Sequence, residues 1–178
     1  MNSFILFLRG INVGGKNKIL MKDLKELLSS LGFFNVQTYL QSGNVVFQHD
    51  EQDVLSWEIG VKEAISDKFG LNVPVLILKS EDLKRSVDSN PYQGEEIEKL
   101  YYVFLSETPS QDKIGDLKSI DFKKDELDVK GKTLYIKVDT KISQSKITQN
   151  LIEKKLGENA TMRNHKTVVK MMELGNSE

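Results

Sequence analysis

The chain has 178 residues, of which 39% are hydrophobic and 29% charged, with a formal net charge of -1 and no cysteine. This composition is typical of a folded globular protein of one large or two small domains, and it excludes disulfides, thiol nucleophiles and cysteine metal sites. No apolar run approaches the roughly 18 residues that cross a bilayer, and the N-terminal apolar segment is too short for a signal peptide, so we expect a soluble, cytoplasmic protein.

The charges are segregated along the chain. Residues 1–48 hold five basic and two acidic side chains, residues 49–128 hold ten and nineteen, and residues 129–178 hold ten and five. Charge runs are usually solvated faces of surface helices. The alternative is a surface that attracts anions and is built jointly by the two basic ends.

The first half of the chain predicts strands and helices in the order βαββαβ. The continuous apolar run 4–8 indicates a buried strand, and apolar residues at helical spacing predict a helix over 21–31 that ends at Gly32. Strands 36–41 and 45–47 flank Ser42-Gly43-Asn44 as a hairpin, and a helix over 51–69 leads to a strand at 73–78.

After a charged helix over 81–89 and an acidic linker at 94–98, the same order recurs. The expected elements are a strand at 100–105, a short helix at 110–117, strands near 122–129 and 133–138, a helix that Ser143 caps and Gly157 ends, a strand at 160–162, and a last helix capped by Asn164.

These patterns predict an α+β protein with a duplicated ferredoxin-like fold, two antiparallel βαββαβ units and a C-terminal helix. We expect a first half over 1–90 with its trailing helix and a second half over 99–178. One unit leaves one face of its sheet bare, yet strands 4–8 and 100–105 are apolar on both faces. We therefore expect those faces to be covered and the halves to pack as one compact body.

Three sequence blocks resemble the family of small bacterial proteins known as domain of unknown function 1697. They are LRGINVGGKNKILMKDL at 8–24, TYLQSGNVVF at 38–47, and SKI at 145–147 with TMRNHKTVVKM at 161–171. The resemblance implies a duplicated ferredoxin-like fold and no assigned activity. The chain departs from the family pattern at His165, where tryptophan is usual, and at Lys141-Ile142-Ser143, where a glycine-containing loop is usual.

The segment from Gly10 to Asn17 fits G-x-x-x-x-G-K after a strand, which is the pattern of a phosphate-binding loop. A nucleotide triphosphatase loop also needs a hydroxyl after the lysine and a helix that starts there, but Asn17 and the segment 19–21 intervene. We therefore expect no P-loop NTPase. The glycines and neighbouring cations either hold a phosphate-like anion or form a tight solvated loop.

We predict binding of a small anionic, phosphate-bearing ligand where the glycine loop, the Ser42 hairpin and the Arg163 helix start converge. The candidate residues are polar, basic or glycine residues of the family-like blocks. They are Arg9, Gly10, Asn12, Gly14, Gly15, Lys16, Tyr39, Ser42, Asn44, Ser145, Lys146, Thr161, Arg163 and Asn164. Each group has a structural alternative as a turn, helix cap or exposed cation.

Other chemistry has less support in the sequence. His49 and His165 have no histidine or cysteine companions, so we expect neither a metal site nor a cofactor, and no G-x-S-x-G motif accompanies them. The acidic pairs at 95–96 and 125–126 are interpreted as solvated charge. Whether a reaction is catalysed stays open, and we expect a binding protein rather than an enzyme.

Two alternative functions remain open. The βαββαβ unit is shared by RNA-recognition modules, and Phe4, Phe7 and Phe47 are candidates for base stacking, although the RNP1 motif is absent and the pI is about 6.2. The other alternative is a protein-interaction module without a small ligand, which an apolar centre within an exposed acidic face would favour. The oligomeric state is undecided.

Overall fold

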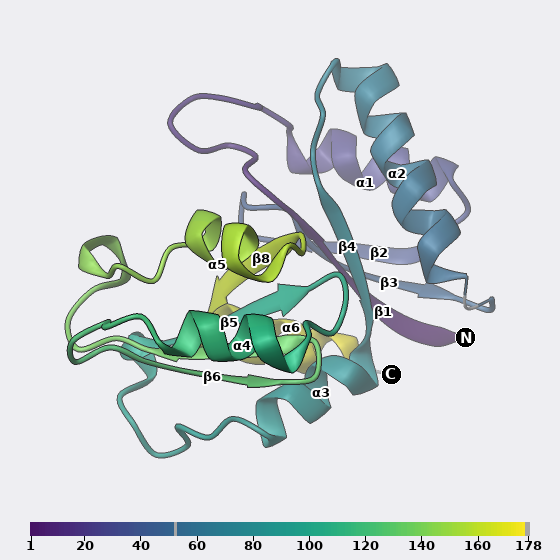
Figure 1. Ribbon diagram of the computed structural model, residues 1–178. Helices are drawn as coiled ribbons and strands as arrows, with labels where there is room; N and C mark the ends of the chain where they lie inside the picture. The colour runs from purple at the N-terminus through teal and green to yellow at the C-terminus, as the bar shows by residue number, and fades with distance from the viewer. Residues whose placement is uncertain (52, 177–178) are drawn as a thin grey trace. The chain divides into compact units, whose positions relative to one another are not determined.

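The computed structural model describes residues 1–51 and 53–176 and divides the chain into two compact units (Figure 1). The first unit comprises Met1–Arg85 and the chain from Lys170 onward, and the second comprises Ser86–Val169. The boundaries therefore fall inside two helices, whereas the sequence placed the linker after residue 90. The packing of the two halves as one body stays a prediction.

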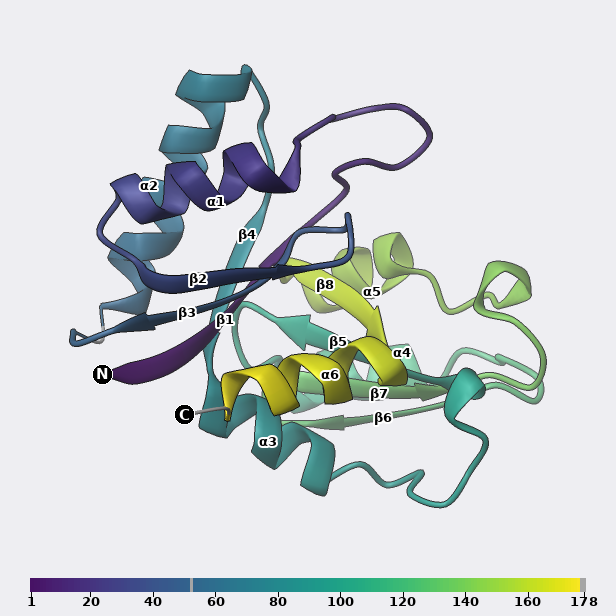
Figure 2. The ribbon, with the colours of Figure 1, turned by 180° about the vertical axis from the view of Figure 1, so that it is seen from behind.

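The first unit is a four-stranded antiparallel sheet with two helices on one face (Figures 1 and 2). Its strands have the spatial order β2-β3-β1-β4, which is that of a ferredoxin-like unit. Its elements are β1 (Asn2–Leu8), α1 (Met21–Ser30), β2 (Phe34–Tyr39), β3 (Asn44–His49), α2 (Val54–Phe69) and β4 (Val75–Lys79).

The core of the first unit lies between this sheet and its helices. Alternate residues of β1 face the helices, and Phe4 stacks on Phe47 of β3 at a centroid distance of 5.4 Å. Phe33 also stacks on Phe47, at 4.3 Å, and Trp57 of α2 meets Phe4 edge-on at 4.9 Å. These rings supply a large part of the apolar burial that holds α2 on the sheet.

The opposite face of the first sheet is also buried. Ile5 and Phe7 of β1 are completely buried, and Val46 of β3 is nearly so. Helix α6 (His165–Gly175) reaches this face, because a Cβ built on Gly175 would lie 3.0 Å from Ile5 Cδ1. The covered face agrees with the apolar residues found at successive positions of β1.

The second unit repeats the architecture with the strand order β6-β7-β5-β8. The duplicated ferredoxin-like fold with a C-terminal helix is thereby confirmed. Its elements are α3 (Ser80–Asp88), which the unit boundary crosses, the 3-10 turn η1 (Ile97–Lys99), β5 (Leu100–Leu105), α4 (Gln111–Lys118), β6 (Glu126–Lys130), β7 (Thr133–Lys137), the 3-10 turn η2 (Ile142–Gln144), α5 (Gln149–Leu156) and β8 (Ala160–Asn164).

The face of the second sheet away from α4 and α5 carries a buried polar cluster. The Tyr102 hydroxyl receives a hydrogen bond from Asn90 Nδ2 at 2.9 Å and lies 3.1 Å from His165 Nδ1. The Tyr135 hydroxyl donates to the Ser86 carbonyl at 2.9 Å. Because burial removes water, these bonds satisfy polar groups that would otherwise be costly to bury.

Side chains of the second helix of each unit cover an outer strand. Glu58 of α2 accepts a bond from the Ile77 N–H of β4 at 2.7 Å, and Gln149 of α5 bonds both the Met162 N–H and the Ala160 carbonyl of β8. Unpaired strand edges invite pairing with other chains. The two units thus protect corresponding edges in the same way.

Two local predictions for the second unit are wrong. Helix α5 is capped by Thr148, whose hydroxyl accepts from the Leu151 N–H at 3.2 Å, whereas Ser143 lies in the 3-10 turn η2. The strand predicted near 122–129 begins only at Glu126, because Phe122 turns into the core and Lys123 has a positive φ of 61°.

Candidate functional site

The predicted glycine loop of the first unit folds as a miniature hairpin. Its tip is a tight turn in which Gly14 and Gly15 have φ values of 57° and 75°, and the Lys16 N–H donates to the Val13 carbonyl at 3.0 Å. Positive φ at both central residues is the geometry of a type I′ turn. Helix α1 begins only at Met21, so the helix terminus that a P-loop would present to a phosphate is not at the lysine.

Asn12 joins this loop to the Ser42 hairpin. Its amide nitrogen donates to the Ile19 carbonyl at 2.9 Å and to the Gln41 carbonyl at 2.7 Å, while its oxygen accepts from the Ile19 N–H at 3.0 Å. Two of the three segments predicted to converge therefore do lie together, and Asn12 is a structural joint between them.

The other polar residues of the hairpin mostly serve its own turn. Asn44 is completely buried, and its amide donates to the Tyr39 carbonyl at 3.0 Å and to the Ser42 hydroxyl at 2.9 Å. Arg9 is half-buried, whereas Gly10 and Lys16 are exposed. The first unit thus offers an ordered loop with an exposed cation, and within it Asn44 has a turn-forming role.

The third predicted segment belongs to the second unit. Thr161 and Arg163 are on β8, and Asn164 caps α6 by accepting from the Thr167 N–H at 2.8 Å. Burial lowers the pKa of the Arg163 guanidinium to about 10, so it remains charged at neutral pH. The convergence of this segment with the glycine loop stays a prediction.

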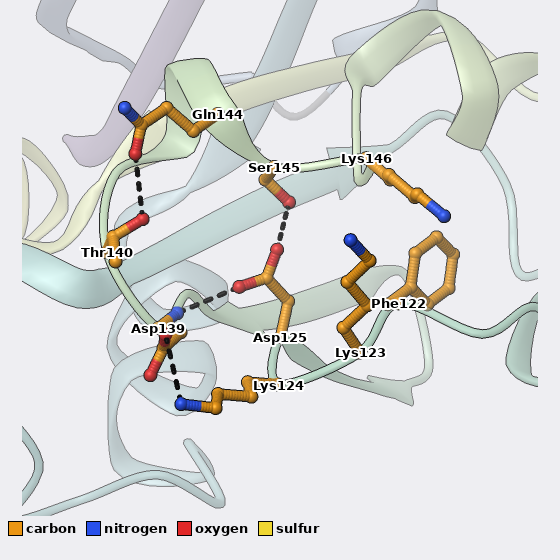
Figure 3. Close-up of a pocket in the computed structure, with 9 residues that line it drawn as sticks. All are labelled: Phe122, Lys123, Lys124, Asp125, Asp139, Thr140, Gln144, Ser145 and Lys146. Carbon is orange, nitrogen blue, oxygen red and sulfur yellow. Dashed lines mark hydrogen bonds and ion pairs between the residues drawn. The ribbon is translucent and has the colours of Figure 1, made fainter.

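Ser145 and Lys146 line a pocket of the second unit (Figure 3). The pocket has a volume of about 310 Å³, which is near the lower limit for small-molecule sites. Three segments supply its lining: the loop before β6, the loop after β7, and the segment from the last residue of η2 toward α5. The lining residues are Phe122, Lys123, Lys124, Asp125, Asp139, Thr140, Gln144, Ser145 and Lys146.

Asp125 fixes these three segments to one another. One carboxylate oxygen accepts from the Asp139 N–H at 2.8 Å and the other accepts from the Ser145 hydroxyl at 2.6 Å. The Ser145 oxygen in turn accepts from the Ile147 N–H at 3.0 Å. The interpretation of Asp125 as solvated charge is therefore wrong, because both of its oxygens are engaged in holding the pocket.

The charges of the pocket do not balance. Lys124 lies 3.9 Å from the Asp139 carboxylate, and the Asp125 charge is met by two hydrogen-bond donors. Within the described part of the chain, no carboxylate lies at ion-pair distance from Lys123 or Lys146. The pocket thus has two cations without an acidic partner.

The two sides of the pocket differ in character. Figure 3 shows the ammonium groups of Lys123 and Lys146 on the side of the Phe122 ring, with Thr140 and Gln144 on the other side. The Thr140 hydroxyl donates to the Gln144 side-chain oxygen at 3.0 Å. The two side chains thus form a neutral, polar pair on that side of the pocket. One side suits an anion and the other suits hydroxyl groups.

Sequence reasoning found Ser145 and Lys146 but missed the rest of this pocket. The missed residues are Gln144 and those of two loop segments, 122–125 and 139–140, whose short charged sequences also suit a solvated surface. The two lysines that precede Asp125 were one indication of an anion site in the sequence. Only the tertiary hydrogen bonds of the Asp125 carboxylate, however, bring the segments of the pocket together.

The described residues also bear on metal sites, membrane spans and base stacking. Over 1–51 and 53–176, no group of three or more histidine, aspartate or glutamate side chains is arranged to hold a metal ion. No helix within the same residues combines the length and apolar character needed to span a membrane. Phe4, Phe7 and Phe47 have no exposed surface, so these rings are not available for stacking on bases.

Comparison with known proteins gives a fold relative and a family. The chain is similar to the conserved bacterial protein SP0830 from Streptococcus pneumoniae, with 24% sequence identity, 99% of each chain covered and a TM-score of 0.78. No curated protein matches the chain. The family described as "Protein of unknown function (DUF1697)" matches residues 1–135, which include the loop 122–125 but precede the pocket residues 139–146. The chain belongs to the DUF1697 family.

Proposed function

We propose that the protein binds a small phosphate-bearing ligand in the pocket of the second unit. The observation that carries this proposal is the charge imbalance of the pocket: Lys123 and Lys146 line it without an acidic partner among the described residues. Two ammonium groups facing one cavity repel each other, and an anion between them removes that repulsion. Charge-assisted hydrogen bonds to phosphate oxygens then add to the attraction.

The rigidity of the pocket also supports the proposal. Asp125 joins the loop of Lys123 to the loop of Lys146 through Ser145, so both cations are carried on connected segments. A site whose parts are already in place loses less conformational entropy when the ligand binds. The Asp125 carboxylate itself repels an anion, and its two hydrogen-bond donors offset part of that repulsion.

The test is isothermal titration calorimetry with inorganic phosphate at low ionic strength, where screening of exposed charges is weakest. The double variant Lys123→Gln with Lys146→Gln is expected to weaken phosphate binding by about two- to thirtyfold, since each solvent-exposed ion pair contributes roughly 0.2–1 kcal/mol. The matched control, Lys154→Gln with Lys155→Gln, removes the same charge from α5 residues that do not line the pocket. Equal losses in both variants would mean that only net charge attracts phosphate.

A second candidate site is the glycine loop of the first unit. The bond from Asn12 to the Gln41 carbonyl favours it, because this bond holds the loop against the Ser42 hairpin. Exposed Lys16 and Lys18 supply charge there, and nothing among the described residues pairs with either. If this loop is the site, Lys16→Gln with Lys18→Gln will lose phosphate affinity and the pocket variant will keep it.

RNA binding and protein interaction stay alternative predictions. Sheet-face RNA binding is less favoured, because Phe4, Phe7 and Phe47 are completely buried. A mobility shift with mixed RNA at low salt, where phosphate contacts are strongest, would reveal binding through another surface.

A further inference from the structure

The shape and lining of the pocket narrow the class of ligand. We infer that the second-unit pocket selects a hydroxylated phosphomonoester, of which glycerol phosphate is a short example, over inorganic phosphate. This inference rests on the proposed function, because it presupposes that Lys123 and Lys146 hold the phosphate group.

The volume of the pocket leaves room for an organic group beside the phosphate. A cavity of about 310 Å³ holds the equivalent of about ten water molecules, each of which occupies about 30 Å³ in the liquid. A bare phosphate leaves most of this space to water. A phosphate on a polyol fills more of the space and displaces that water.

The polarity of the lining sets the chemistry of the organic part. Lys123 and Lys146 lie on the Phe122 side, so the phosphate belongs there. Thr140 and Gln144 lie on the other side (Figure 3). The Thr140 hydroxyl donates to Gln144 Oε1, which leaves the Gln144 amide hydrogens to donate and the Thr140 oxygen to accept. Hydroxyl groups, which both donate and accept, match this pair better than a charged or purely apolar group.

Asp125 lies between the two sides and reinforces this choice. Each of its oxygens accepts one internal bond, from the Asp139 N–H or from the Ser145 hydroxyl. A carboxylate oxygen can accept more than one hydrogen bond, so both retain capacity for a donor. A ligand hydroxyl supplies such a donor, whereas a second phosphate at this position would be repelled.

The experiment compares glycerol 3-phosphate and inorganic phosphate by calorimetry on the intact protein and on Thr140→Val, an isosteric change of an exposed side chain. Gln144→Met serves as the second variant. We expect glycerol 3-phosphate to bind at least about fivefold tighter than inorganic phosphate, because one or two neutral hydrogen bonds contribute roughly 1 kcal/mol each. Each variant should reduce this preference, because it lowers the affinity for glycerol 3-phosphate more than the affinity for inorganic phosphate.

Equal affinities for both compounds, or an unchanged preference in both variants, would overturn the ligand class while the phosphate site stands. Failure of every compound to bind would overturn both.

Discussion

Gly43 is the residue at which one added methyl group should be most damaging to the first unit. It lies in the turn between β2 and β3 with a φ of 73°, and a Cβ built there would lie 2.6 Å from Leu8 Cβ and 2.9 Å from Ile11 Cδ1. The Leu8 atom cannot yield, since it is fixed to the backbone of β1, and the Leu8 N–H donates to the Gly43 carbonyl at 2.8 Å.

The cost of Gly43→Ala has two parts. The left-handed backbone costs a residue with a Cβ about 1–2 kcal/mol, and overpacking in a close-packed region costs about 1–3 kcal/mol more. The expected loss is therefore about 2–5 kcal/mol, a large part of the stability of a typical domain. Gly70→Ala is the matched control, because Gly70 has a φ of 68° and open space around its Cβ position.

The assay is urea unfolding followed by the fluorescence of Trp57. This is the one tryptophan of the sequence, and it packs on Phe4 and Phe47 in the same unit as Gly43. Gly70→Ala should lose only about 1–2 kcal/mol, the backbone part of the cost. If both variants lose the same free energy, the contact with Leu8 contributes nothing and the reasoning is refuted.

Three further outcomes are expected. Asp125→Ala should cost about 1–3 kcal/mol in urea unfolding, since it leaves the Asp139 N–H and the Ser145 hydroxyl without their acceptor, and an unchanged midpoint would contradict its joining role. Asn12→Ala should increase the rate of limited proteolysis within 10–18, because the bonds that fix this loop are lost, and an unchanged cleavage pattern would contradict that. Burial lowers the pKa of His165 below its ordinary 6.5, so the unfolded chain binds its proton first as pH falls. Stability should therefore decrease as pH falls from about 6.5 to the lower folded-state pKa, and His165→Gln should remove that part of the slope in thermal melts at successive pH values.

The sequence predicted the architecture because local patterns and packing agree. Apolar residues at helical spacing predicted α1, and alternating apolar and polar residues beside the Ser42 turn predicted the first hairpin. Asn164 indicated the start of α6, because its side chain caps that helix. Each of these signals acts within a few residues, so it can be recognised without knowledge of the tertiary structure.

The pocket could be predicted only in part. Ser145 and Lys146 were recognised within a family-like block, but Lys123 and Thr140 come from loops without periodicity. The Asp125 carboxylate connects loops that are far apart in the sequence. This role was not predicted, because a carboxylate beside another acidic residue in a polar segment has the pattern of solvated charge. Long-range hydrogen bonds of this kind leave no local signal.

Binding of a phosphate group between Lys123 and Lys146 is tested by titrating the ¹⁵N-labelled protein with glycerol 3-phosphate and following its backbone amide chemical shifts. We expect saturable shifts at 122–125 and 139–147, the segments that line the pocket. Shifts confined to the glycine loop at 10–18, or no saturable shift at all, would contradict binding between these lysines.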